Sequence, residues 1–244
     1  MYFCNVILTQ NNTLMKKTLK LLALVAMTAG LAFAACDNPG GGTETAEWVD
    51  LGLPSGLLWA ECNLGATKPE EYGDYYAWGE TVTKEVYDWS TYKYCNGGYD
   101  LLTKYCNKSE YGYNGFTDNL TTLQPSDDVA TARLGDGARM PTQDEWRELH
   151  SNTTSEWTTM NGVNGRKLTS KTNGKSLFFP AAGGRGGSEL HVAGECGRYW
   201  SSSLDAGYHP SIAWLFSFGS DYQYVGSIGR LYGFSVRAVC ASQN

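Results

Sequence analysis

Apolar and polar positions alternate over the last part of the chain in the way that predicts β-strands. In 234–240 (F-S-V-R-A-V-C), one side of the predicted strand carries Phe234, Val236, Ala238 and Cys240. A period of two is typical of a strand with one buried face. A second strand is predicted to open with Tyr199-Trp200, within G-R-Y-W-S-S-S-L. A third is predicted at 57–64, where the apolar side carries Leu58, Ala60, Cys62 and Leu64.

The clearest helix start lies in R-M-P-T-Q-D-E-W-R-E-L (139–149). Thr142 and Glu145 have the spacing of a capping box, in which each residue satisfies a backbone N–H of the first turn. Trp146 and Leu149 follow at helical spacing and share one face. The sequence therefore predicts a short helix that packs its apolar face on the body of the protein.

A second helix start is predicted at P-S-D-D (125–128), with Ser126 as the cap and acidic residues in the first turn. The same two carboxylates, Asp127 and Asp128, leave calcium binding open as an alternative. No further pattern of oxygen ligands accompanies them. We therefore predict no cofactor and no metal site, with calcium as the alternative at this position.

The segment 205–232 has neither a helical nor a strand period throughout, and mixes tyrosine, serine and aspartate with glycine. Tyrosine gives large contact area with few torsions, and serine and glycine adapt, so this composition favours a recognition surface. The alternative is a glycine-rich β-segment with hydrated loops. Trp214 is expected to pack inside. The predicted ligand-binding residues are Asp205, Tyr208, His209, Ser211, Asp221, Tyr222, Tyr224, Ser227, Arg230 and Tyr232.

Composition narrows the class of protein. The chain has 244 residues, with 42% hydrophobic but only 18% charged residues, and it is rich in Gly (29), Tyr (16) and Trp (8). This mixture suits a loop-rich extracellular domain rather than a helical cytosolic enzyme. The net charge of −6 and the lack of a basic patch argue against nucleic acid as a partner.

The N-terminus predicts export and lipid anchoring. Residues 15–35 combine a lysine-rich start with an apolar stretch too short to span a bilayer, as in a signal peptide. The following Cys36 completes a pattern that resembles a bacterial lipobox, so we expect it to be lipidated. An ordinary secretory signal or a membrane anchor is the alternative. We expect 1–14 to precede the natural start, 36–47 to be a flexible tether, and 48–244 to be the folded domain.

No catalytic constellation is legible. His150, His191 and His209 are singletons without the spacing of a zinc site. Ser201-Ser202-Ser203 lacks the setting of a nucleophile, and G-G-R-G-G (183–187) reads as a flexible loop rather than a phosphate loop. For the aromatic and acidic segment Glu70 to Glu80, packing on the core is favoured over a ligand site.

Cys95 and Cys106 stand close together in a polar loop, and an exported chain makes them a plausible local disulfide. Their spacing alone carries this prediction. The remaining cysteines of the domain are far apart in sequence.

Several motifs together resemble a known family, the Fibrobacter succinogenes major paralogous domain, found in secreted and lipidated Bacteroidetes proteins. The element R-M-P-T-x-x-E-W also resembles formylglycine-generating-enzyme-like domains. The resemblance covers most of 48–240 and rests on L-G-L-P-S-G-L-L-W-A-E-C-N-L-G-A (51–66), G-D-Y-Y-A-W-G-E-T (73–81), S-D-D-V-A (126–130), R-M-P-T (139–142), Y-W-S-S-S (199–203) and G-F-S-V-R-A-V-C (233–240).

The resemblance implies an α+β, C-type-lectin-like fold that is loop-rich, has few short helices, and pairs strands from its N- and C-terminal ends. Cys62 and Cys240 would then lie on neighbouring strands and form a second disulfide, with Cys196 in place of either as an alternative. The enzymes of this fold use a closely spaced cysteine pair, and this region offers Cys196 alone. The calcium-binding triplets of sugar-binding lectins are also missing.

The C-terminal frame Y-W-S-S…A-W…G-F-S-V-R resembles the variable proteins of diversity-generating retroelements, which display a hypervariable patch on this fold. The sequence thus predicts a surface-exposed lipoprotein, at the outer membrane or cell surface, that binds a protein or glycan through 205–232. A formylglycine-generating-type enzyme and a structural envelope or adhesin module are the alternatives.

Overall fold

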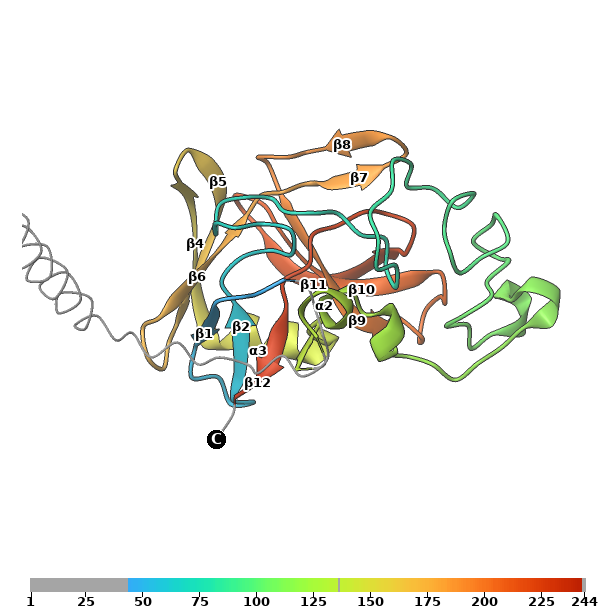
Figure 1. Cartoon of the computed structure of the whole chain (residues 1–244), viewed down its shortest axis with the longest axis horizontal. Helices are drawn as coiled ribbons and strands as arrows, with labels where there is room; N and C mark the ends of the chain where they lie inside the picture. The colour runs from blue at the N-terminus through green and yellow to red at the C-terminus, as the bar shows by residue number, and fades with distance from the viewer. Residues whose placement is uncertain (1–43, 136, 243–244) are drawn as a thin grey trace, which may run out of the picture. The chain divides into compact units, whose positions relative to one another are not determined.

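The computed structural model describes residues 44–135 and 137–242, which lie in one compact unit (Figure 1). The described body is mainly β-sheet, with few short helices and long loops, so the α+β class and the loop-rich character are confirmed. The predicted start, the signal peptide, Cys36 and most of the tether lie outside the described residues. Within 44–135 and 137–242, no helix is long and apolar enough to cross a membrane.

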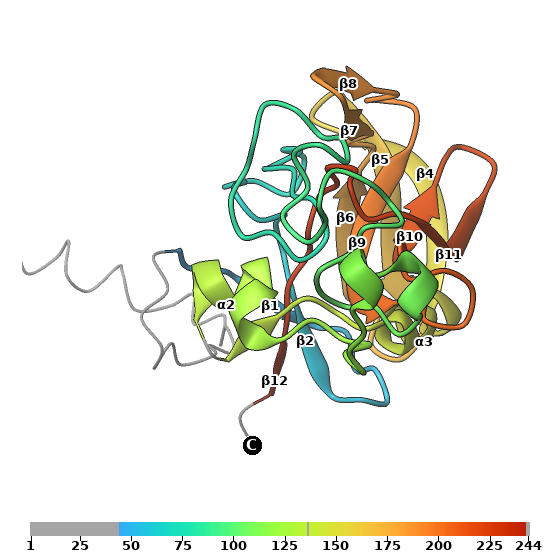
Figure 2. The same ribbon diagram turned by 90° about the vertical axis from the view of Figure 1, so that its right-hand side faces the viewer.

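Strands from the two ends of the domain form one sheet, as predicted. Its order is β1 (Trp48–Asp50), β2 (Leu57–Ala60), β12 (Val239–Ala241) and β3 (Ala138–Arg139). The pairing of β2 with β12 is antiparallel and sets Trp59 opposite Val239. The two ends lie side by side in both views (Figures 1 and 2).

Three further sheets follow along the chain. β4 (Thr153–Met160), β5 (Val163–Ser170) and β6 (Ser176–Pro180) form an antiparallel meander. β7 (Gly184–Gly186) and β8 (Glu189–His191) form a small hairpin. The prediction of a flexible loop at 183–187 was therefore wrong, because the outer edge of β7 also bonds to Gly233.

The last sheet carries most of the predicted recognition segment. Its order is β9 (Gly197–Leu204), β10 (Ile212–Phe218) and β11 (Gln223–Gly229), with β10 in the middle and both pairings antiparallel. β10 and β11 form a hairpin, referred to below as the C-terminal hairpin. α3 (Gln143–Asn152) packs on one face of this sheet.

Each described α-helix begins directly after a residue whose side chain caps its first turn. Thr142 and Glu145 form the predicted capping box at the start of α3, and Trp146 and Leu149 are buried. α2 (Val129–Leu134) is instead capped by Asp128, whose carboxylate accepts from the N–H groups of Ala130 and Thr131. Ser126 is therefore not the cap. It lies in the 3₁₀ turn η3 (Pro125–Asp127), and the other 3₁₀ turns are η1 (Ser109–Tyr111) and η2 (Tyr113–Gly115).

The segment 234–240, which was predicted as one strand, joins a strand only from Val239 onward, and it separates two apolar clusters. The predicted face carrying Phe234, Val236, Ala238 and Cys240 is buried in one cluster, and Val239 is buried in the other. Arg237 points to the second side and is fully buried. Its guanidinium donates to the backbone oxygens of Ala60, Glu61 and Phe178, and lies 4.4 Å from the ring centroid of Phe179. This arginine therefore ties the C-terminal segment to β2 and β6.

Candidate functional site

Six of the ten predicted recognition residues lie at the two ends of the C-terminal hairpin, whereas Tyr224 and Ser227 lie within β11 and Arg230 and Tyr232 follow it. The turn end is Gly219–Tyr222, which joins β10 to β11, and the loop end is Asp205–Ser211, which leads from β9 into β10. The strands between them have seven residues each. At about 3.4 Å per residue the two ends are roughly 20 Å apart. The segment 205–232 is therefore not one continuous patch.

The turn end forms one wall of a groove of about 420 Å³. The opposite walls come from β4, from the turn before β9, and from β9 itself. This turn-end groove is lined by Trp157, Val192, Glu195, Cys196, Arg198, Gly219, Ser220, Asp221 and Tyr222. Its size lies within the range of small-ligand sites, and aromatic walls with a few charged groups are typical of such sites. Two of the predicted residues, Asp221 and Tyr222, thus line a concave site.

Two glycines let exposed tyrosine rings lie flat at the turn end. A Cβ at Gly219 would stand 2.5 Å from the Tyr222 ring, and a Cβ at Gly226 would stand 2.6 Å from the Tyr224 ring. The two rings are 5.8 Å apart and remain 40% and 53% exposed. Arg166 fixes the turn from below by donating to the carbonyl oxygens of Gly219 and Ser220. The rings are therefore presented on an ordered backbone.

Charged groups surround the groove. Arg198 is half-buried, lies 5.6 Å from the ring centroid of Phe234, and makes no ion pair with any residue in the described ranges. Glu195 and Asp221 stand exposed at the rim. Burial raises the pKa of the Cys196 thiol despite the nearby Arg198, so this thiol is neutral near pH 7. The groove can thus offer hydrogen-bonding groups of both charge signs and aromatic contact.

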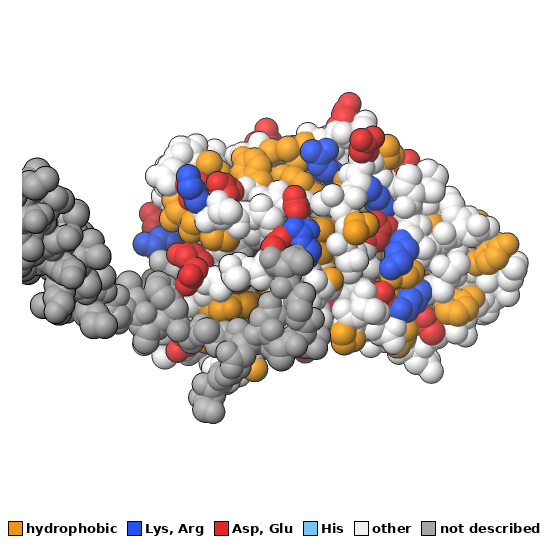
Figure 3. Space-filling view, viewed as in Figure 1, with side chains coloured by type: hydrophobic (Ala, Val, Ile, Leu, Met, Phe, Trp, Pro, Cys, Tyr) orange, Lys and Arg blue, Asp and Glu red, His pale blue; other side chains and the backbone are white. Residues whose placement is uncertain are grey.

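The loop end packs on the long loop 95–117. The His209 ring lies 3.9 Å from that of Tyr111 and 6.0 Å from that of Tyr99. Lys108 donates to the carbonyl of Tyr208, whose side chain is 77% exposed. Burial, with Lys108 and Arg230 nearby, lowers the pKa of His209, and Ser211 bonds to its Nδ1. The described surface at the right-hand end of Figure 3 shows scattered apolar side chains.

Three of the predicted ligand-binding residues are buried. Arg230 is fully buried between Trp78 and Tyr92, and donates to the carbonyls of Lys104 and Tyr105. The prediction of Arg230 as a ligand contact was therefore wrong, because its guanidinium holds the long loop in place.

Asp205 and Ser211 are also buried, so neither presents a side chain on the surface. The Asp205 carboxylate accepts a hydrogen bond from Ser227, and Ser211 bonds to His209. Both therefore support neighbours on the hairpin.

Two aromatic residues of the segment also differ from expectation. Tyr232 is half-buried and stacks on Phe234, with ring centroids 6.0 Å apart, so it contributes to the core. Trp214, which was expected inside, is half-buried beneath the guanidinium of Arg147 at 5.4 Å. The alternation of β10 directs Trp214 toward the α3 side, where the helix covers it only in part.

The carboxylates considered for calcium are engaged in other bonds. Asp127 accepts from the hydroxyls of Tyr94 and Tyr105, at 2.5 and 2.6 Å, and from Lys104 at 2.5 Å. Asp128 is turned away to cap α2 and to accept from Met140 N–H. The described residues contain no group of three or more side chains that could hold a metal ion.

The predicted disulfides are not formed. Cys62, Cys95, Cys106 and Cys196 are free thiols, so neither Cys95–Cys106 nor Cys62–Cys240 is a pair. The thiols of Cys95 and Cys106 point to different carbonyls, those of Trp89 and Lys108, at 3.0 and 3.1 Å. Closeness in sequence did not bring them together, because the loop between them follows its own turns.

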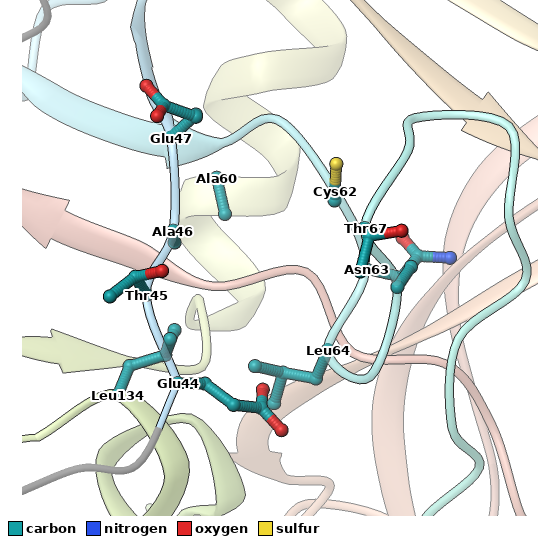
Figure 4. Close-up of a pocket in the computed structure, with 11 residues that line it drawn as sticks. Glu44, Thr45, Ala46, Glu47, Ala60, Cys62, Asn63, Leu64, Thr67 and Leu134 are labelled. Carbon is teal, nitrogen blue, oxygen red and sulfur yellow. The ribbon is translucent and has the colours of Figure 1, made fainter.

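The aromatic segment Glu70–Glu80 packs on the core, as favoured from the sequence: Tyr75, Tyr76 and Trp78 are buried. A smaller pocket of about 240 Å³ lies where the chain enters the domain (Figure 4). Glu44 to Glu47 run along one side of it and Cys62 to Leu64 along the other. The carboxylate of Glu44 also pairs with Arg133. Its polar groups thus serve to hold the entering chain.

Sequence reasoning missed the groove residues outside 205–232. Trp157 comes from β4, and Glu195 precedes β9. Arg198 alternates with buried Tyr199 in β9, which is the only signal that could have marked it as outward-facing. No family model, curated protein or solved structure matches this chain, so the geometry of the groove carries the functional argument.

Proposed function

We propose that this chain is a recognition protein whose folded domain binds a protein or glycan ligand at the turn-end groove. The observation that carries the proposal is the exposed Tyr222 ring, which lies flat over Gly219 at the edge of a groove with charged walls. Rigid aromatic side chains next to adaptable small residues are typical of binding surfaces. Arg198, which has no acidic partner in the described chain, leaves a cation available to a ligand.

We further propose that the domain has a C-type-lectin-like fold. Support comes from the antiparallel pairing of β2 with β12, from the loop-rich body, and from the hairpin that precedes the C-terminal strand. The variation of a recognition segment by a retroelement is part of the same proposal, with the retroelement-like frame of residues as its support. Such variation would change exposed residues of the turn end and leave the buried residues of the retroelement-like frame unchanged.

We also propose that the protein is held at a membrane surface by a lipid anchor. The lipobox-like pattern ending at Cys36 supports a lipid anchor at the outer membrane or cell surface. A tether after this residue would hold the domain away from the membrane. A recognition surface far from the membrane suits a ligand carried by another cell or particle.

The test is a screen of the purified protein on glycan and surface-protein arrays, followed by binding measurements on two matched variants. Tyr222→Ala removes an exposed ring at the turn end, and Tyr208→Ala removes one at the loop end. We expect Tyr222→Ala to weaken binding about thirtyfold, because an anchor residue contributes about 2 kcal/mol. Tyr208→Ala should bind like the natural protein.

Both substitutions should leave the unfolding free energy within about 0.5 kcal/mol, because each removes an exposed side chain. Undiminished binding by Tyr222→Ala would place the site elsewhere and reject the proposal.

A further inference from the structure

The two edge strands of the sheet β9–β10–β11 differ in whether other parts of the chain hydrogen-bond to them. The outer edge of β9 is covered, because its backbone bonds to Ser235, Pro141 and Thr121. Among the described residues, no backbone bond reaches the outer edge of β11. β11 lies at the right-hand margin of the view in Figure 2, with no labelled element beyond it. Its residues are half-buried or exposed along the whole strand.

The direction of the free groups follows from the hairpin. The N–H of Gly219 donates to the carbonyl of Tyr222, which makes this a hydrogen-bonded pair. Since such pairs alternate along an antiparallel ladder, Gln223, Val225 and Ser227 direct their N–H and C=O groups away from β10. A row of unpaired backbone groups is a template for another strand.

β11 lacks the devices that normally protect an edge. It has seven residues, Q-Y-V-G-S-I-G, with no charge and no proline. The eight-residue edge strand β4 carries the exposed Glu156, and the other edge strands in the described body are short, charged or ended by a proline. Natural proteins block lateral pairing with charges, prolines or short edges. The absence of all three from one long edge indicates a surface that is meant to pair.

We propose that β11 pairs antiparallel with β11 of a second copy of this chain, so that two three-stranded sheets become one. A strand without charge meets its own copy without repulsion, which a charged strand does not. When the two-fold axis passes through Gly226, all seven residues of β11 lie opposite residues of the other β11. When it passes through Val225 or Tyr224, fewer residues of the two strands lie opposite each other. The pairing is isologous, as in most homodimers.

The side chains support this register. It sets Tyr224, which is 53% exposed, opposite the half-buried Ile228 of the other copy, on the same face of the sheet. Aromatic and β-branched residues are a favourable cross-strand pair. Gly226 meets its own copy at the axis, and a Cβ placed there would stand 2.6 Å from the Tyr224 ring, which would have to move aside.

The pairing has a consequence for recognition. Antiparallel strands place the turn end of one copy beside the loop end of the other. The groove at Tyr222 and the exposed Tyr208, which are roughly 20 Å apart in one chain, would become neighbours across the dimer, so the Tyr208→Ala control of ligand binding is measured at concentrations where the chain is monomeric. The dimer itself does not depend on the proposed ligand site, and its test needs no ligand.

The test uses cysteine cross-linking of the purified full chain. At the axis, Gly226 and its copy form a pair without mutual hydrogen bonds, with Cα atoms about 4.5 Å apart, which suits a disulfide. Gly226→Cys should therefore form a covalent dimer under mild oxidation, linked at 226 by peptide mapping. Ser220→Cys, exposed in the same hairpin but off the axis, is the matched control and should cross-link at least tenfold less.

Sedimentation across a concentration series gives the second readout. An interface of one strand pair is small, so the natural chain should dimerise reversibly as concentration rises. Gly226→Lys places like charges opposite each other and should remain monomeric, while Gly226→Ala, which displaces the Tyr224 ring equally but carries no charge, should still dimerise. Equal cross-linking at 226 and 220, a natural chain that stays monomeric, or a Gly226→Lys variant that still dimerises would each overturn the proposal.

Discussion

The turn end and the loop end of the C-terminal hairpin have similar residues but are ordered by different forces. At the turn end, a tight hairpin and two glycines hold Tyr222 and Tyr224 flat on the backbone. At the loop end, the exposed Tyr208 rests on a long loop with little regular structure. That loop is held from below by Arg230, which donates to the carbonyls of Lys104 and Tyr105.

The difference shows that a tyrosine- and glycine-rich composition does not by itself define one surface. The turn end is largely local, because its tyrosine rings rest on glycines of the same hairpin, with Arg166 of β5 as a distant support. The loop end is not local, because buried polar groups from distant parts of the chain must meet. Asp127 adds a second support, since it binds the hydroxyls of Tyr94 and Tyr105. We therefore expect substitutions of Arg230 and Asp127 to disturb the loop end alone.

The largest effect is expected from Arg230→Met. The substitution keeps most of the volume between Trp78 and Tyr92 but leaves buried carbonyls without donors, which should cost about 3 kcal/mol of unfolding free energy. Urea unfolding measures the loss, and amide exchange should rise in 95–117 but not in 219–226. Arg198→Met, a half-exposed arginine near the turn end, is the control and should change stability by less than about 0.5 kcal/mol. An equal rise of amide exchange in 95–117 and in 219–226 would contradict the view that Arg230 supports the loop end alone.

A smaller effect is expected from Asp127→Asn, at about 2 kcal/mol near pH 7, because a charged acceptor for Lys104 and two tyrosines is lost. Burial alone would raise the pKa of Asp127, but the bonds from Lys104, Tyr105 and Tyr94 outweigh it and hold the pKa below its usual range. Its contribution is therefore present above about pH 4 and is lost as the pH falls through the lowered pKa.

Unfolding measured from pH 7 to pH 2 should show the natural protein and Asp127→Asn converging at the acid end. A difference that stays constant over this range would argue against the ionised carboxylate as the support of the loop.

The smallest effect is expected from Asp128→Asn at about pH 4, since asparagine also caps helices and the change there should be below about 1 kcal/mol. Burial raises the pKa of Asp128 to about 6, although the N–H groups of Met140, Thr131 and Ala130 lower it in part. A raised pKa means that the natural protein loses stability as the pH rises from about 4 to about 6. The variant should lack this slope in a urea titration, and a variant with the same slope would assign it to another group.

The sequence predicted those parts of the fold that depend on local pattern. The alternation from Phe234 to Cys240 identified both faces of the C-terminal segment, and Thr142 with Glu145 identified the start of α3. The helix cap at Asp128 was missed by two residues, because Pro125 opens a 3₁₀ turn before the helix. Period and capping thus suffice where neighbours in sequence decide the structure.

The site was predicted only in part, because its remaining members come from elsewhere in the chain. Tyr222 and Asp221 were found from composition, but Trp157 and Glu195 carry no local signal for the groove. Arg230 stands among glycine and half-buried residues and looked exposed, and its burial depends on a loop about 125 positions earlier. Contacts between residues so far apart in sequence cannot be predicted from hydrophobic periodicity or from a short motif.

The most direct measurement is amide hydrogen exchange of the protein with and without the ligand selected on the arrays. We expect the ligand to slow exchange at the turn-end groove, in 192–198 and 219–224. We expect little change in 95–117 and 206–211 of a monomeric Gly226→Lys variant, where the two ends cannot meet across a dimer. Protection confined to the loop end in that variant would contradict the central claim that the turn-end groove is the binding site.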